Sequence, residues 1–268
     1  MPIHPTAIVD SNAQVAESAD IGPHAVIEEN VKIGENVKVY PNAFISGWTE
    51  IGDDCEIHPG AVIGHIPQDF HFTGGRSYCR IGPRTIIREF ASVHRGTQPE
   101  SWTLVGEDCF ILGYAHVGHN CDLGRGVKVY NCAALSGHVT VGDHVIVSGY
   151  SLTHPFVRIG DHVLVAGGTR LTKDVPPYMM VVHESECVGI NTIGLRRSGR
   201  FTDEEIKEAK DTYRLLFRSG RMFREAAEEL RTRAKTKTGR AILEFISADS
   251  KRGIIGGAKT TDHATESD

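Results

Sequence analysis

Aliphatic residues recur at every sixth position from Ile3 to Leu171, with two gaps and with Thr153 as the one exception in frame. A second set of positions, four residues after each aliphatic one, holds small residues, chiefly Ala and Cys. Neither a helix of period 3.6 nor a strand of period 2 produces this double pattern. The pattern predicts a left-handed parallel β-helix built from hexapeptide repeats.

In such a fold each hexad supplies one short strand and a corner, and three hexads close a triangular coil of 18 residues. The aliphatic and the small residue both point inward, and the coils pair through backbone hydrogen bonds at roughly 4.8 Å spacing. Stability comes from stacking, because no coil buries its apolar face alone. A β-sandwich of short strands is the alternative, but sandwiches do not keep one register through so many repeats.

Both gaps in the repeat are multiples of six residues, so the frame resumes after each of them. They predict two loops that leave the solenoid, at about 69–80 and 98–104. Loops that leave a rigid scaffold cost little closure entropy and often carry function.

The repeat is expected to stop at Asp174–Tyr178, because its two prolines cannot continue a strand ladder. This gives a β-helix domain over residues 1–177 and a helical domain over 178–250. The polar, small-residue tail at 251–268 is predicted to be disordered.

Within the helical domain, Thr202 is a candidate N-cap and Glu205 completes a capping box. Two further helices are expected at Met222–Leu230 and Ala241–Ile246. The fold class is therefore β with an α C-terminal domain.

The 18-residue coil allows distant histidines to be compared, because residues one coil apart stack in a column. After allowance for the two loops, five histidines fall on one edge of the prism: His94, His116, His119, His138 and His154. His65 belongs to the same edge, whereas His144 and His162 belong to another. Such a set can act as general base and hydrogen-bond donors to a polar substrate. It can also bind a metal across a subunit interface.

The metal alternative is that of the β-helical carbonic anhydrases, which resemble this chain in fold. It is disfavoured because His116 and His119 have only two residues between them and no carboxylate accompanies the set. We therefore expect neither a metal nor a cofactor. A non-catalytic scaffold would have no use for the histidines.

Composition narrows the class further. The chain has 268 residues, 40% of them hydrophobic, and a net charge of −5, which is typical of a soluble protein of one or two domains. No apolar stretch approaches the ~20 residues that span a bilayer, and the N-terminus lacks a signal region. We expect a cytoplasmic protein without stable membrane insertion. The mildly acidic chain also lacks the interleaved basic and aromatic residues of nucleic-acid binding. Cys55, Cys109 and Cys121 occupy small inward positions and are read as reduced core residues.

An ordered set of motifs makes the sequence recognisable. The motifs are Pro67–Asp69, Val93–Thr97, Ala115–Asp122, Gly137–Asp143, Asp174–Tyr178, Val188–Asn191 and Tyr213–Gly220. Hexads alone are shared by many acyl- and nucleotidyltransferases. The ordered set covers the chain to about residue 248 and resembles the acyl-[acyl-carrier-protein]–UDP-N-acetylglucosamine O-acyltransferases.

The resemblance implies a homotrimer with active sites between adjacent prisms. It implies transfer of a 3-hydroxyacyl chain from acyl carrier protein to the 3-position of UDP-N-acetylglucosamine, the first step of lipid A biosynthesis, without a covalent intermediate. By motif position His119 is the general base and the Gly137 N–H is the oxyanion donor.

The resemblance also assigns the remaining site residues. Sugar-contacting positions are Asp69, His71, His94, His116 and His138, and nucleotide-site positions are His154, Asn191 and Arg197. Gly167 matches the position that limits acyl length. Because the carrier protein is acidic, Arg196, Arg197, Arg200, Arg218 and Arg221 are candidates for one docking patch, with ordinary solvated charge as the alternative.

Five positions depart from the usual pattern of the family. Asn120 replaces Asp, His71 replaces Lys, Pro155 replaces Gln, Ile193 replaces Glu and Ser198 replaces Arg. An amide at Asn120 can orient an imidazole but stabilises its charged form less. The last three changes affect the nucleotide end, so an amide-forming N-acyltransferase acting on a 3-amino sugar stays open as an alternative.

Overall fold

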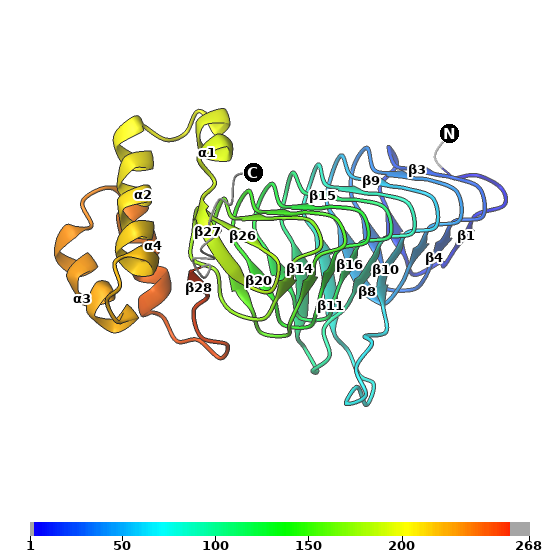
Figure 1. Cartoon of the computed structure of the whole chain (residues 1–268). Helices are drawn as coiled ribbons and strands as arrows, with labels where there is room; N and C mark the ends of the chain where they lie inside the picture. The colour runs from blue at the N-terminus through cyan, green and yellow to red at the C-terminus, as the bar shows by residue number, and fades with distance from the viewer. Residues whose placement is uncertain (1–2, 258–268) are drawn as a thin grey trace, which may run out of the picture.

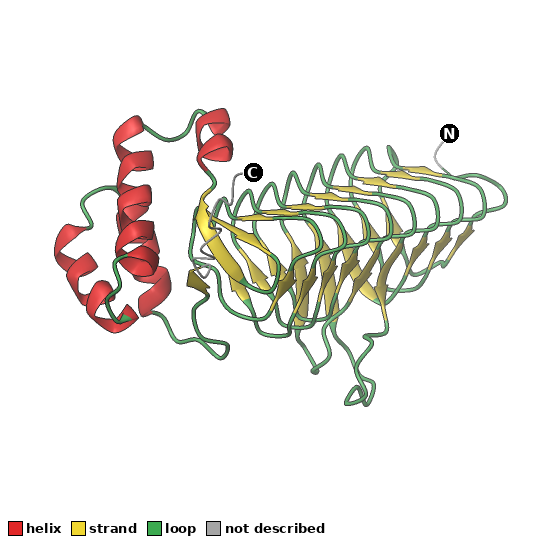
Figure 2. Cartoon of the chain, viewed as in Figure 1, coloured by secondary structure: helices red, strands yellow, loops and turns green. Residues whose placement is uncertain are grey.

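The computed structural model describes residues 3–257. A long left-handed β-helix forms a triangular prism, and a helical domain packs at its C-terminal end (Figure 1). Short strands lie on three flat faces of the prism and turns form its edges (Figure 2). The predicted fold class is confirmed.

Parallel strands build each face, with one strand contributed by every coil. Face 1 consists of β1 (Ile8–Val9), β4 (Val26–Ile27), β7 (Phe44–Ile45), β10 (Val62–His65), β13 (Ser92–His94), β16 (His116–Val117), β19 (Ala134–Leu135), β22 (Leu152–Thr153) and β25 (Arg170–Leu171). Face 2 consists of β2 (Gln14–Val15), β5 (Lys32–Ile33), β8 (Trp48–Ile51), β11 (Tyr78–Ile81), β14 (Trp102–Val105), β17 (Asp122–Leu123), β20 (Thr140–Val141) and β23 (Arg158–Ile159).

Face 3 is the longest because it continues beyond the repeat. It consists of β3 (Asp20–Ile21), β6 (Lys38–Val39), β9 (Glu56–Ile57), β12 (Ile86–Ile87), β15 (Phe110–Ile111), β18 (Lys128–Val129), β21 (Ile146–Val147), β24 (Leu164–Val165), β26 (Met179–Val182), β27 (Glu186–Ile190) and β28 (Gly256–Gly257).

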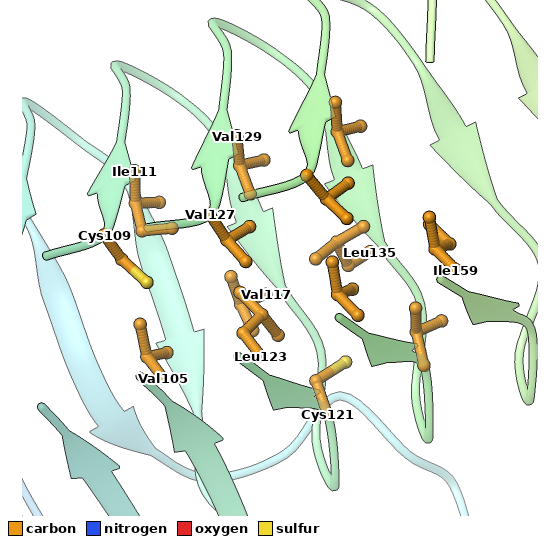
Figure 3. Close-up of a cluster of buried hydrophobic side chains, with 14 of the residues drawn as sticks. Val105, Cys109, Ile111, Val117, Cys121, Leu123, Val127, Val129, Leu135 and Ile159 are labelled. Atoms are coloured by element: carbon orange, nitrogen blue, oxygen red, sulfur yellow. The ribbon is translucent and has the colours of Figure 1, made fainter. Parts of the chain in front are cut away.

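The core is a column of inward side chains that repeats from coil to coil. Val117 pairs with Leu135 across β16 and β19, and both side chains are fully buried. Figure 3 shows the aliphatic residues and the sulfur atoms of Cys109 and Cys121 pointing into the same interior. All six cysteines are free, and Cys55, like these two, is buried as expected.

Both predicted loops are present, but each begins and ends three residues earlier than expected. They occupy residues 66–77 and 95–101 and project from the lower edge of the prism in Figure 1. The shift arises because β8, β11 and β14 are four residues long and pair over their full length. Residues at the end of each predicted loop therefore belong to a strand.

The two prolines do not end the strand ladder. Val175 forms a parallel bridge with Ile159, and β26 pairs in parallel with β24 before β27 returns antiparallel to it. Pro176 and Pro177 lie in the turn between these pairings, where no ladder N–H is needed. The β structure thus extends to Ile190, past the expected boundary at 177.

The helical domain contains α1 (Thr192–Ser198), α2 (Asp203–Arg218), α3 (Phe223–Arg233) and α4 (Lys237–Ser247). The capping box of Thr202 and Glu205 is confirmed, with both hydrogen bonds present. α3 and α4 contain the two further predicted helices, and the sequence pattern missed the short helix α1. Helix α2 packs against α3, α4 and β27. No helix within residues 3–257 is long and apolar enough to cross a membrane.

The segment after α4 returns to the prism. Asp174 N–H donates to the Gly253 carbonyl at 2.9 Å, Ile255 N–H donates to the Asp174 carbonyl at 2.9 Å, and β28 pairs with β27. Burial of Ile255 anchors this strand. The prediction of a disordered tail is therefore wrong for 251–257, whereas 258–268 lies outside the described residues.

A buried ion pair links this junction to the solenoid. The Asp174 side chain is fully buried and accepts hydrogen bonds from Arg158 Nε at 2.7 Å and from the Arg158 N–H at 2.9 Å. Because removal of Asp174 leaves the partly buried Arg158 guanidinium and the Arg158 N–H without their carboxylate, Asp174→Ala should lower the free energy of unfolding by about 3 kcal/mol. Denaturant unfolding measures this, with exposed Asp122→Ala as the control. Equal midpoints for the two variants would contradict the prediction.

Candidate active site

The edge between faces 1 and 2 carries the predicted histidines, and we call it the histidine edge. A pocket of about 370 Å³ opens there. It is lined by Gln68, His94, His116, Gly118, His119, Ser136, Gly137 and Pro155. The 18-residue count therefore placed three of the five histidines in one pocket.

The coil register is what assembles this edge. His65 pairs with His94 across β10 and β13, and the rings of His94 and His116 lie 5.2 Å apart. The rings of His119 and His138 are 5.3 Å apart and perpendicular. His138 turns the corner with a φ of 60°, a conformation that His tolerates better than most residues.

His119 is held in one tautomer by its neighbours. Its Nδ1 lies 3.0 Å from Asn120 Oδ1, and the same oxygen accepts a hydrogen bond from the Thr97 N–H at 2.9 Å. Since an amide oxygen only accepts, Nδ1 carries the proton and Nε2 carries the lone pair. Nε2 lies 3.7 Å from Asp69 Oδ2. The imidazole is therefore oriented as a base.

Glycine at position 137 is a steric requirement of the pocket. A Cβ there would lie 2.5 Å from both Cε1 and Nε2 of His119, closer than real contacts allow. Within residues 3–257 no group accepts a hydrogen bond from the Gly137 N–H. The lone pair of His119 Nε2 and the unoccupied N–H of Gly137 thus lie next to each other. This arrangement suits proton abstraction and stabilisation of an oxyanion.

Three other histidines of the histidine edge are held neutral. Burial is the main cause that lowers the pKa of His116 to about 4, with smaller contributions from the nearby His94 and His119. Burial also lowers the pKa of His94, whose Nδ1–H donates to the Ile66 carbonyl at 2.5 Å. Burial is likewise the main cause that lowers the pKa of His138. Neutral imidazoles can donate and accept hydrogen bonds, as a polar substrate requires.

Asp69 reaches His119 from the 66–77 loop but does not itself line the pocket. The backbone N–H of His71 donates to Asp69 Oδ1 at 2.9 Å and is the main cause that lowers the pKa of this carboxyl group. The His71 ring is 90% exposed and contacts Asp69 at 3.1 Å, outside the residues that line the pocket. His154 is exposed and lies next to Pro155, which lines the pocket.

The remaining predicted residues lie on the other two edges. Asn191 caps α1: its Oδ1 accepts from the Gly194 N–H at 3.0 Å, and its Nδ2 donates to the His162 carbonyl at 2.9 Å. It shares a pocket of about 250 Å³ with His144, His162 and Arg200 on the edge between faces 2 and 3. Arg197 lies in α1, which we group with this helix-side edge.

Gly167 lies on the third edge, between faces 3 and 1. A Cβ added there would meet only the Gly149 carbonyl oxygen, at 3.4 Å. The same edge exposes Phe90, Tyr114 and Tyr150, and we call it the aromatic edge. Within one chain the predicted site residues are thus spread over three edges.

The expected arginine patch is split in two. Arg196 and Arg200 lie in or directly after α1, and Arg200 Nη1 lies 2.7 Å from His144 Nε2. Arg218 ends α2 and donates to the Tyr213 hydroxyl at 3.0 Å, while Arg221 pairs with Glu229. A helix of α2's length separates the two groups by about 24 Å. The prediction of one cluster is wrong because α2 runs between its members.

Several contacts at the site were not foreseen. Gln68 lines the pocket, and Ser92 Oγ lies 2.9 Å from His116 Nδ1. Phe156 stacks on His138 with ring centroids 4.7 Å apart. The 18-residue count would have found Phe156, since it lies one coil after His138. The same count, with allowance for the second loop, places Ser92 one coil before His116.

The repeat and the pocket on its edge define the class of hexapeptide-repeat transferases. Comparison with known proteins identifies the family within this class. The family described as bacterial transferase hexapeptide (six repeats) matches residues 30–65. The family described as UDP N-acetylglucosamine O-acyltransferase, domain 2, matches residues 174–255. No group of three or more His, Cys, Asp or Glu side chains among the described residues is arranged to hold a metal ion.

Relatives match along almost the whole chain. The acyl-[acyl-carrier-protein]–UDP-N-acetylglucosamine O-acyltransferase of Burkholderia lata is 44% identical over 260 residues, covering 94% of this chain and 98% of that one. Its counterpart from Alkalilimnicola ehrlichii is 47% identical over 256 residues, with the same coverage. The chain belongs to this family.

Solved structures agree. The UDP-N-acetylglucosamine acyltransferase of Francisella novicida has a TM-score of 0.91 at 38% identity, over 96% of this chain and 95% of that chain. The enzyme of Campylobacter jejuni has a TM-score of 0.89 at 32% identity, over 96% and 100%. The resemblance stated from the motifs is confirmed.

Burial of His116 makes stability depend on pH. Its imidazole takes up a proton near its ordinary pKa of 6.5 when unfolded, but only near 4 when folded. The contribution to stability is therefore fully present above pH 6.5 and is lost as the pH falls through this window. His116→Asn should reduce the loss between about pH 7 and pH 5 by roughly 1–2 kcal/mol.

Denaturant unfolding at the two pH values measures this difference. His183→Asn, at an exposed position in the turn between β26 and β27, is the matched control and should keep the wild-type pH dependence. An unchanged pH dependence in His116→Asn would contradict a buried neutral imidazole.

Proposed function

We propose that this chain transfers a 3-hydroxyacyl group from acyl carrier protein to the 3-hydroxyl of UDP-N-acetylglucosamine, the first step of lipid A biosynthesis. The observation that carries the proposal is the oriented Nε2 of His119 beside the unoccupied N–H of Gly137, in a chain of this family. Free, buried cysteines fit a reducing cytoplasm.

The chemistry follows from the two groups. His119 Nε2 takes the proton of the sugar hydroxyl as that oxygen attacks the thioester carbonyl carbon. Negative charge on the carbonyl oxygen is stabilised by the Gly137 N–H. The tetrahedral species then collapses, the C–S bond breaks, and the imidazolium returns its proton to the departing thiolate.

No acyl-enzyme intermediate is part of the proposal. Burial raises the pKa of Cys79 and of Cys121 to about 12, so neither thiol forms the thiolate that a nucleophile requires. His94, His116 and His138 instead orient the sugar through neutral hydrogen bonds, together with Asp69.

A homotrimer completes the site. The outward residues of face 1 are mainly apolar: Ile8, Val26, Phe44, Val62, Ala134 and Leu152. Those of face 2 are mainly charged: Lys32, Glu50, Arg80, Asp122 and Arg158. Face 3 presents Ile86, Phe110, Ile146 and Leu164 on its later coils. A threefold assembly that buries face 1 of one subunit on face 3 of the next leaves face 2 in water.

This packing explains the separation of the site residues. It turns the aromatic edges toward the threefold axis and brings the histidine edge of one subunit beside the helix-side edge of its neighbour. The His119 pocket then faces Asn191 and Arg197 of a second copy, and Gly167 lies on an edge buried in the trimer. Carrier docking is assigned to Arg196 and Arg200, which belong to the helix-side edge.

The decisive experiment offers the protein UDP-N-acetylglucosamine and its 3-amino analogue, each with a panel of 3-hydroxyacyl carrier proteins. Mass spectrometry should find an ester on the natural sugar. A product only with the amino sugar would assign an N-acyltransferase, and its basis would be the changed positions Pro155, Ile193 and Ser198. No transfer to either sugar, together with stoichiometric bound zinc or iron, would favour the metalloenzyme alternative.

His119→Ala tests the mechanism. Because it removes the base and leaves the coil register intact, transfer should fall by more than about 100-fold while the trimer persists in sedimentation. His183→Ala, at an exposed histidine outside the pocket, should keep wild-type activity. Retention of most activity in His119→Ala would place the base elsewhere.

A further inference from the structure

A stack of alternating arginines and aromatic rings crosses face 2 at the base of the two loops. Its members in order are Phe72, Arg95, Trp48, Arg76, Tyr78, Trp102 and Arg80. Trp48, Tyr78 and Trp102 are direct partners across β8, β11 and β14. The coil register thus aligns the rings, and the guanidinium groups lie between or beside them.

One end of this stack holds the loop that reaches the active site. The Arg95 guanidinium lies 5.7 Å from the ring centroid of Phe72 in the 66–77 loop and 5.6 Å from that of Trp48 in the solenoid. Phe72 N–H donates to the Asp69 carbonyl at 3.0 Å. A single turn therefore ties the Phe72 ring to the carboxylate that faces His119.

Apart from the contact of Asp69 with His119, the hydrogen bonds from the loop to the rest of the described chain lie at its two stems. At the first stem the His94 Nδ1–H donates to the Ile66 carbonyl at 2.5 Å, and at the second the Glu100 N–H donates to the Arg76 carbonyl at 2.8 Å. Gly74 and Gly75 at the tip have φ values of 92° and 106°, and a Cβ at Gly74 would meet nothing within 4 Å. The Phe72 ring is thus the apolar attachment between the stems, next to the Asp69 contact that it supports.

Arg95 is an unusual cation. It is half-buried, its Nε is buried without a hydrogen-bond partner, and burial lowers its pKa. No carboxylate of the described residues lies within salt-bridge distance of it. Partial burial of an unpaired guanidinium is costly, so the two aromatic faces supply its stabilisation. A partly buried cation between two aromatic rings points to a structural role for Arg95.

We propose that Arg95 is a positioning residue, whose guanidinium clamps the 66–77 loop to Trp48 through the Phe72 ring and thereby fixes Asp69 against His119. This inference rests on the proposed function for its catalytic meaning. Its structural content, a loop held closed by a cation between two rings, stands without any substrate.

Four variants separate the clamp from general stability. Arg95→Met removes the cation at similar length, Arg95→Lys retains it, and Phe72→Leu removes the ring while keeping an apolar side chain. Arg80→Met is the matched control, because Arg80 lies 4.6 Å from the Trp102 ring at the other end of the stack, away from the loop. Circular dichroism and sedimentation establish that each variant folds and assembles like the wild type.

The first readout needs no substrate. Arg76 is exposed, but Ser77 on the other side of the scissile bond is buried, so trypsin cleaves after Arg76 faster when the loop opens. Arg95→Met and Phe72→Leu should be cut there roughly three- to fivefold faster than wild type, as expected for loss of one cation–π contact. Arg95→Lys should be cut at close to the wild-type rate, as should Arg80→Met. Cleavage of Arg95→Met at the Arg80→Met rate would overturn the clamp.

The second readout is kinetic. Without the clamp Asp69 is held less firmly against His119 even while the loop is closed, so kcat/KM for the sugar nucleotide should fall by roughly two- to fivefold in Arg95→Met and recover in Arg95→Lys. Faster cleavage with unchanged kcat/KM would overturn the positioning role. If the wild-type protein shows no acyl transfer but Arg95→Met is still cleaved faster than wild type, the proposed function is refuted and the clamp stands.

Discussion

The whole structure depends on the parallel register between successive coils. The pairing of β13 with β16 that places Val93 beside Val117 in the core also places Ser92 beside His116 on the outward side. Because side chains alternate between the two faces of a strand, a slip of one residue would expose the core column and bury the histidines. The histidine edge is therefore specified by the same backbone pairing that buries the aliphatic residues, and the energy that holds the core also preorganises this edge.

The regularity of the solenoid also limits what one chain can enclose. A prism with a rigid interior offers only edges and flat faces, and a pocket of about 370 Å³ on one edge is open on its outer side. The two ejected loops cover part of it, and in the proposed trimer a neighbouring prism encloses the rest. The contrast between apolar Leu152 on face 1 and charged Asp122 on face 2 favours burial of face 1 in that assembly. In the proposed trimer, assembly and catalysis thus depend on the same outward pattern.

Sequence reasoning succeeded wherever the repeat governs a position. It found the core, the capping box at Thr202 and the edge shared by His94, His116 and His119, because each depends on a fixed spacing. It failed where contacts cross between coils or domains without a period. The strands of face 2 include residues that had been predicted as loop. Ile255 packs back on the prism after α4, and α2 separates the arginines that were expected to form one patch. The stack around Trp48 was missed for a related reason: its strand rings share one column of the register, but Phe72, Arg76 and Arg95 come from the two loops, where no period applies.

The C-terminal segment shows how far such contacts reach. Lys251 Nζ lies 4.4 Å from the Phe156 ring centroid, and Phe156 stacks on His138, which meets His119 at 5.3 Å. After burial and His119, Lys251 is a further cause that lowers the pKa of His138, whereas Asp69 opposes it. The arginine-clamped loop and the returning strand therefore act on the same imidazoles from opposite ends of the edge. One brings a carboxylate toward them and the other brings a cation. For His138, burial, His119 and Lys251 outweigh the opposing effect of Asp69 on the pKa, so this imidazole stays neutral and can donate and accept hydrogen bonds.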